Sequence, residues 1–134
     1  MATIRRCLAR IRHVTGGDPL RVREIDIQDI VVLNLQRAIQ AAIDLAAHLI
    51  SSGTYGLPDS LKAHFSILVR EQVIAHELGQ RLEAMVEFRN IAVHDYEALN
   101  VEILGRIVAE RLPDLELFAD AASRFLARRD AAPE

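Results

Sequence analysis

The sequence predicts an all-α protein, an antiparallel bundle of four to five helices. Of its 134 residues 51% are hydrophobic, yet only 4% are aromatic and none is Trp, so Ala, Leu, Ile and Val must fill the interior. Six Gly and four Pro leave few helix breakers. Apolar residues also recur at intervals of three and four, which is the helical period. This length suits one domain with its own core, and we expect a single helical domain over residues 1–134.

A first helix is expected over about residues 3–14, because Ile4, Leu8 and Ile11 fall on one face. The glycines and the proline of the segment 15–19 should end it. Residues 20–25 read as a connection, so residues 1–24 form an N-terminal helix and linker. The alternation at residues 20–23 could also form a short strand, although nothing else in the chain would pair with it.

The longest helix is expected from about Asp26 to Ser52, with Asp26 as its cap and Asp29 in its first turn. Its apolar positions form so wide a surface that we expect it to pack on more than one neighbour, across a dimer interface as well. A narrow polar stripe follows the same helix at spacings of three and four: Arg37, Gln40, Asp44 and His48. Asp44 and His48 alone offer too few ligands, so no metal site is predicted.

Three further helical segments complete the bundle. One starts with Pro58 near its first position and runs to about Arg70. The next covers residues 75 to 92 or 93.

The last helical region begins at Ala98 and Asn100, and Pro113 should kink or divide it near Arg111. Residues 131–134 should fray.

Composition also limits location and partners. A single cysteine, Cys7, excludes an internal disulfide framework. No apolar run approaches the ~20 residues that cross a bilayer, so we expect no membrane contact and a cytoplasmic protein. The net charge of −3 excludes a general polyanion binder, and any nucleic acid must be held locally.

The chemistry is concentrated in residues 89–96. Arg89 lies seven residues after Leu82, on a stripe that should be buried, and therefore needs a carboxylate such as Glu83 or Glu87, an aqueous cleft or an anionic ligand. His94 lies about 140° away on a continuous helix. Either the helix ends near residue 93 and His94 turns back, or one of the two residues comes from a second subunit.

Two neighbours add polar groups to this segment. Asn90 supplies a donor and an acceptor, and the Tyr96 hydroxyl could donate to a phosphate or accept a modifying group. No Ser or Cys stands beside the histidine to act as a nucleophile, and no acidic cluster would hold magnesium. An Arg and a His are the residue types that catalyse metal-free RNA cleavage, in which the ribose 2′-hydroxyl attacks the phosphate and no cofactor is needed.

The motif Arg-x4-His-x-Tyr, formed by Arg89, His94 and Tyr96, resembles the signature of the HepT toxins within the HEPN superfamily. The resemblance covers roughly residues 25–122. Further matching segments are Leu35–Ala46, the Pro58 loop, the pair Phe65 and Leu68, and Met85–Asn90.

This resemblance implies an all-helical homodimer with its active cleft at the dimer interface. It implies a metal-independent endoribonuclease that leaves 2′,3′-cyclic phosphate and 5′-hydroxyl ends. Arg89 and His94 would be catalytic, with Asn90 and Tyr96 supporting them at the RNA. The resemblance also implies a cognate antitoxin, a minimal nucleotidyltransferase, which silences the toxin by transferring AMP to Tyr96.

Two other hypotheses remain open at this point. The same Arg and His could hold a nucleotide for a partner nucleotidyltransferase without any cleavage. Alternatively, the chain could be a helical scaffold whose arginine is structural.

Overall fold

The computed structural model describes residues 1–53 and 55–131, and within them every regular element is helical. The α-helices are α1 (Ala2–Thr15), α2 (Ile25–Ser51), α3 (Leu61–Arg70), α4 (His76–His94), α5 (Val101–Arg106) and α6 (Leu112–Ala131). Short 3-10 segments, η1 (Pro19–Arg23) and η2 (Tyr96–Ala98), and a π-helical segment, η3 (Ile107–Arg111), lie between them. Because α5, η3 and α6 are continuous, the prediction of four to five helices in an all-α fold is confirmed.

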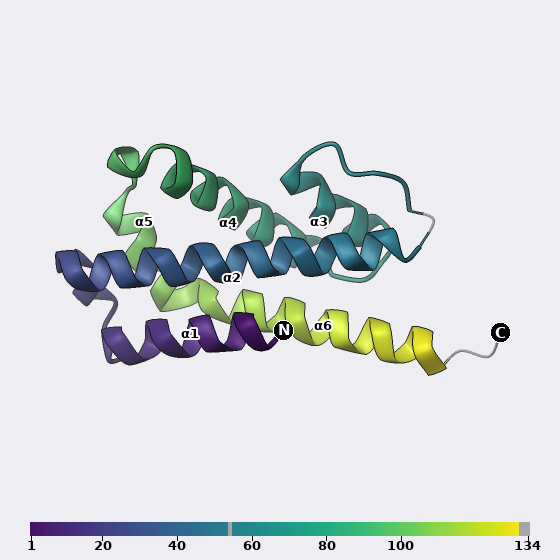
Figure 1. Ribbon diagram of the computed structural model, residues 1–134, viewed down its shortest axis with the longest axis horizontal. Coiled ribbons are helices and arrows are strands. Elements are labelled where there is room, and N and C mark those ends of the chain that lie inside the picture. Colours follow the sequence, from purple (N-terminus) through teal and green to yellow (C-terminus); the bar gives the residue numbers. More distant parts are fainter. Residues whose placement is uncertain (54, 132–134) are drawn as a thin grey trace.

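Helix α2 is the central element, with α1 and α6 on one side and α3 and α4 on the other (Figure 1). Consecutive long helices run in opposite directions, so α4 returns antiparallel along α2 (Figure 1). The core between them contains Leu35, Leu49, Phe65 and Phe118, all fully buried. The rings of Phe65 and Phe118 pack edge to face with centroids 5.4 Å apart, which ties α3 to α6.

By length and composition alone, α2 is apolar enough to cross a membrane. Its buried side chains instead pack against the other helices of the bundle. Their apolar character is therefore accounted for by the bundle core.

Two helix starts differ slightly from the sequence predictions. Helix α2 begins at Ile25 after Glu24, so Asp26 lies in the first turn and is not the cap. Helix α3 begins after Ser60, whose hydroxyl accepts the backbone N–H of Ala63, so Pro58 precedes the helix.

The start predicted at Asn100 is confirmed, because its side chain caps α5 by accepting the backbone N–H groups of Glu102 and Ile103. Ala98 lies before this helix, in the 3-10 segment η2.

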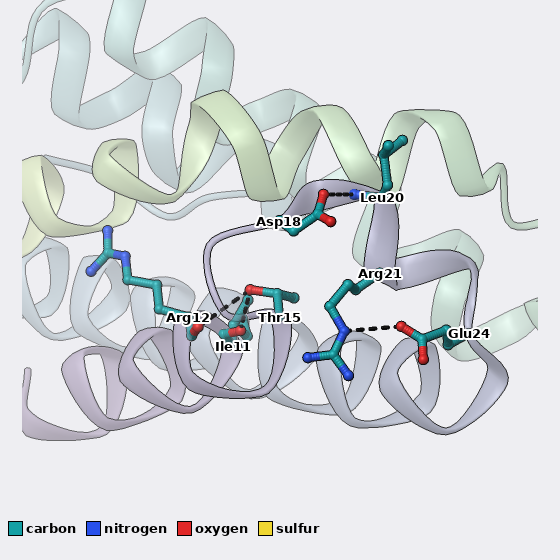
Figure 2. Close-up of polar contacts among 7 residues, drawn as sticks. All are labelled: Ile11, Arg12, Thr15, Asp18, Leu20, Arg21 and Glu24. Atoms are coloured by element: carbon teal, nitrogen blue, oxygen red, sulfur yellow. Dashed lines mark hydrogen bonds and ion pairs between the residues drawn. The ribbon is translucent and has the colours of Figure 1, made fainter.

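The connection between α1 and α2 forms the 3-10 turn η1, so the alternative of a short strand is wrong (Figure 2). Gly16 ends α1 in the left-handed conformation, with φ 60°. The Asp18 carboxylate then accepts the backbone N–H of Leu20 at 3.0 Å, and Arg21 donates to Glu24 at 2.9 Å (Figure 2). These local contacts turn the chain from α1 into α2.

Pro113 disturbs the last helix as predicted near Arg111, but it does not divide it. The π-helical segment η3 ends at Arg111, and the helix then continues as α6. Proline has no N–H and crowds the carbonyl four residues earlier, and the wider π turn accommodates this. The fraying predicted for 131–134 falls almost wholly outside the described residues.

Candidate functional site

Helix α4 stays regular through His94, since the N–H of Asp95 still donates to the carbonyl of Ile91 at 2.8 Å. The helix thus ends one residue beyond the predicted position 93, but His94 is still helical, so the alternative in which it turns back toward Arg89 is wrong. Arg89 and His94 project from α4 about 140° apart. One chain does not direct both side chains toward the same point.

Arg89 is half-buried and is held by two neutral amides. Its Nη1 donates to Asn90 Oδ1 at 3.0 Å, and its Nη2 donates to Gln40 Oε1 on α2 at 2.8 Å. Among the described residues it forms no ion pair. A cation positioned by neutral acceptors keeps its full charge available for an anion.

The carboxylates considered as partners of Arg89 are engaged elsewhere. Glu87 accepts from Lys62 at 2.6 Å, and Glu83 accepts from the hydroxyl of Ser66 at 2.6 Å. Both contacts link α4 to α3. The alternative of a structural ion pair between Arg89 and one of these glutamates is therefore wrong.

Gln40 is a site residue that the motif did not reveal. Its Oε1 accepts from Arg89, and its Nε2 donates to Asp44 Oδ1 at 2.9 Å. The available signal was the polar stripe on an otherwise apolar helix. Asp44 thus serves as an acceptor for Gln40, and the described residues contain no cluster of three or more His, Cys, Asp or Glu side chains suited to a metal.

His94 is exposed at the last position of α4. Asn90 lies one helical turn before it on the same face, and Asn90 also accepts from Arg89. Asn90 therefore stands between the face that carries the cation and the face that carries the imidazole.

Tyr96 folds back on the start of α2. Its hydroxyl donates to Asp29 Oδ1 at 2.8 Å. Burial, and then the hydrogen bond and charge of Asp29, raise the pKa of Tyr96 to about 12. The sequence placed Asp29 in the first turn of the long helix, but nothing in it indicated this contact.

Apolar side chains remain uncovered beside these polar groups. Leu33, one turn after Asp29 on α2, is 45% exposed, and Val93, one turn after Arg89 on α4, is 46% exposed. Tyr96 is 41% exposed. The site of a single chain is thus an open surface with an apolar margin.

A groove of about 500 Å³ lies on another face of α4, toward α5 and η3. Arg81, Phe88, Ile103, Arg106 and Arg111 are among its lining residues. Arg89, His94 and Tyr96 do not line it. Asn90 does not line it either, so all four residues of the predicted site lie outside this groove, and two of them, Arg89 and Tyr96, contact α2.

Comparison with known proteins matches this arrangement to one family. Residues 4–122 match the family described as "Ribonuclease HepT-like". The chain is 41% identical over 120 residues to the mRNA nuclease HepT of Shewanella oneidensis, and the match covers 90% of each protein.

Solved structures agree with the sequence comparison. The fold is similar to that of a tri-AMPylated Shewanella oneidensis HEPN toxin in complex with MNT antitoxin, with a TM-score of 0.86, 40% identity and 92% of each chain covered. It is also similar to a toxin–antitoxin crystal structure with AMP-PNP, with a TM-score of 0.87, 40% identity, and 92% of this chain and 93% of that chain covered. By sequence and by fold, the chain belongs to the HepT-like ribonuclease family.

Proposed function

We propose that this chain is the toxin of a HEPN/minimal-nucleotidyltransferase pair, an endoribonuclease that cuts mRNA in the cytoplasm. The observation that carries the proposal is the state of Arg89, a half-buried cation that two amides position and that no carboxylate among the described residues neutralises. RNA phosphate is an anion that such a group binds. The mRNA nuclease activity of the relative with 41% identity points the same way.

In this mechanism the residues of the motif have separate roles. His94 takes the proton from a ribose 2′-hydroxyl, whose oxygen then attacks the adjacent phosphorus. The bond to the 5′-oxygen breaks, that oxygen keeps the electron pair and takes a proton from water, and the products are a 2′,3′-cyclic phosphate and a 5′-hydroxyl end. Arg89 neutralises the additional charge on the phosphate as it becomes five-coordinate, and Asn90 keeps the guanidinium oriented. The 2′-hydroxyl is the nucleophile, so the reaction needs no metal ion.

A homodimer brings the two catalytic groups together. Arg89 and His94 diverge on α4, so a second copy related by a two-fold axis is needed to place the His94 of one chain beside the Arg89 of the other. The exposed apolar side chains of Leu33, Val93 and Tyr96 offer a surface for that contact.

AMP transfer to Tyr96 silences the nuclease activity in this proposal. A cognate antitoxin of the minimal nucleotidyltransferase class transfers AMP to its hydroxyl, as AMPylation of the related toxin in complex with its antitoxin suggests. The adenylate adds bulk and a negative charge to the same side of α2 that contacts Arg89, where it would hinder RNA phosphate.

The catalytic assignment is tested with Arg89→Ala and His94→Ala. Arg124→Ala and His48→Ala are matched controls, because both positions lie outside the motif and its contacts. Loss of the proton acceptor should lower RNA cleavage by about 10²–10⁴-fold, and both controls should cleave normally. Cleavage should persist in excess chelator. Full activity of either motif variant refutes its role, and nucleotide binding by wild type without cleavage supports a non-enzymatic module.

Mixing the two inactive variants tests the shared cleft. In a heterodimer of Arg89→Ala with His94→Ala chains, one of the two clefts retains both native residues if each cleft uses one group from each chain. Cleavage should therefore return in part after subunit exchange. No recovery, with heterodimers demonstrated, contradicts the shared cleft.

A further inference from the structure

The hydroxyl of Tyr96 has one side-chain partner among the described residues, and that partner is a carboxylate. Its proton points at Asp29 Oδ1, 2.8 Å away, which leaves the oxygen lone pairs free on the solvent side. Tyr96 is 41% exposed and Asp29 is exposed as well. A reactive phosphate can therefore approach the hydroxyl oxygen while its proton stays bonded to Asp29.

Both partners are held by the backbone. Asp29 projects from the first turns of the long helix α2. Tyr96 is the first residue of the 3-10 turn η2. In this turn the backbone N–H of Ala98 donates to the carbonyl of Asp95 at 3.0 Å, and the backbone N–H of Leu99 donates to the carbonyl of Tyr96 at 3.1 Å. The helix and the turn thus hold the backbone of both residues, and the hydrogen bond to Asp29 positions the hydroxyl, which reduces the entropic cost of reaction.

The phenol needs help to act as a nucleophile. Burial and the contact with Asp29 raise the pKa of Tyr96 to about 12, so at neutral pH only about one molecule in 10⁵ carries the phenolate. The proton must therefore leave while the new bond forms, and it needs an acceptor. Asp95 and Glu97 flank Tyr96 in sequence, but neither contacts the hydroxyl.

We propose that Asp29 is the general base for adenylate transfer to Tyr96, an inference that rests on the silencing reaction proposed above. The phenolic oxygen forms a bond to the α-phosphorus of an adenine nucleoside triphosphate held by the antitoxin. The bond from that phosphorus to the oxygen bridging the β-phosphate breaks, and pyrophosphate leaves with the electron pair. The phenolic proton passes to Asp29 Oδ1 and then to water, because Asp29 faces solvent.

The toxin thereby carries part of the catalytic equipment for its own modification. The antitoxin supplies the nucleotide, and the toxin supplies both the nucleophile and the proton acceptor. After transfer the tyrosine oxygen has no proton to donate, and its new phosphate repels Asp29. The modified side chain is therefore released from α2.

The test follows adenylation of Asp29→Asn by intact mass, with antitoxin and ATP at saturating concentration. Asparagine keeps an oxygen that accepts the hydroxyl but cannot take its proton. The initial rate should fall by about 10²–10⁴-fold. Asp26→Asn is the matched control, because Asp26 is an exposed acid of the same helical start. Tyr96→Phe gives the blank, and circular dichroism confirms that each variant is folded.

A pH series separates a general base from a residue that only shapes the site. The rate for Asp29→Asn should rise about tenfold per pH unit as the phenolate fraction grows, and wild type should rise less steeply. Asp95 and Glu97 are present in both proteins, so their effect on the pH dependence of the rate is the same in both.

Three outcomes overturn the proposal. A wild-type rate for Asp29→Asn means that the antitoxin supplies the acceptor. A faster rate means that Asp29 restrains Tyr96. A low rate with the pH profile of wild type assigns Asp29 a structural role. If wild type and Asp26→Asn also gain no adenylate, the silencing reaction itself fails.

Discussion

Replacing Gln40 by Glu and Asp44 by Asn in one chain moves a negative charge next to Arg89 without removing a contact. The new carboxylate at position 40 can accept from Arg89 where Gln40 now accepts at 2.8 Å. The new amide at position 44 can donate to that carboxylate along the line where Gln40 now donates to Asp44 at 2.9 Å. The double variant Gln40→Glu/Asp44→Asn thus turns a cation held by amides into a cation held by a carboxylate.

The cost to RNA binding follows from that ion pair. Two unit charges about 4 Å apart attract each other by about 4 kcal/mol at the effective dielectric of a protein surface. Desolvation and solvent screening reduce the net gain for the half-buried Arg89 to about 1–2 kcal/mol. A phosphate must overcome this gain to bind the guanidinium. Since about 1.4 kcal/mol equals a factor of ten, kcat/KM should fall about 5–30-fold, while the fold should become slightly more stable.

The assay is cleavage of a short RNA, with thermal unfolding measured on the same samples. Asp44→Asn alone is the control, because the amide oxygen that it places at position 44 still accepts from Gln40, and this variant should cleave as wild type does. Wild-type cleavage by the double variant would refute the argument that Arg89 must be free of carboxylates. Lower stability with lower activity would indicate local misfolding instead.

Further predictions concern stability and pH. Gly79→Ala should destabilise the fold by about 1 kcal/mol in chemical denaturation: its Cβ would lie 2.4 Å from Val69 Cγ2, and the overpacking of about 1–3 kcal/mol exceeds the gain in helix propensity of about 1 kcal/mol. In a Val69→Ala background the same change should be stabilising, and additive effects would contradict the contact. Arg81→Met should lower the free energy of unfolding by about 1–3 kcal/mol, because the carboxylate of Asp114, 3% exposed, loses its ion pair. This range is reduced to allow for the partial exposure of Arg81. Adding Asp114→Asn should recover most of that loss, and an equally unstable double variant would exclude the ion pair as the cause. The raised pKa of Tyr96 should add about 1 kcal/mol to the free energy of unfolding below pH 10, a value reduced to allow for the solvent exposure of Tyr96. This contribution should vanish as the pH rises from 10 to 12. Tyr96→Phe should lack this loss, and identical pH profiles for the two proteins would disprove it.

The fold was largely predictable because the helical period dominates this sequence. The long helix was expected over 26–52 and forms over Ile25–Ser51. Errors lie at helix ends, where single contacts decide. Helix α3 begins after Ser60 and not at Pro58, because the Ser60 hydroxyl accepts the backbone N–H of Ala63, which has no partner within the helix. Such local choices have little periodic signal.

The site was predictable as a segment, and less so as a set of contacts. Spacing placed Arg89 at the core edge and separated it from His94, and the regular helix confirms that separation. The partners of the motif come from α2 and are distant in sequence. Only the packing of α4 on α2 selects Gln40 for Arg89 and Asp29 for Tyr96. The catalytic roles of Arg89 and His94 are predictions that the cleavage assays test.

Both of those partners lie on one face of α2, about three helical turns apart. The helix therefore fixes the positions of these two partners, Gln40 for the cation and Asp29 for the modifiable hydroxyl, roughly 16 Å apart along its axis. Adding or removing one residue between them would rotate one partner by about 100° relative to the other. Substitutions on this stretch of α2 should be tolerated over evolutionary time far more often than changes of its length.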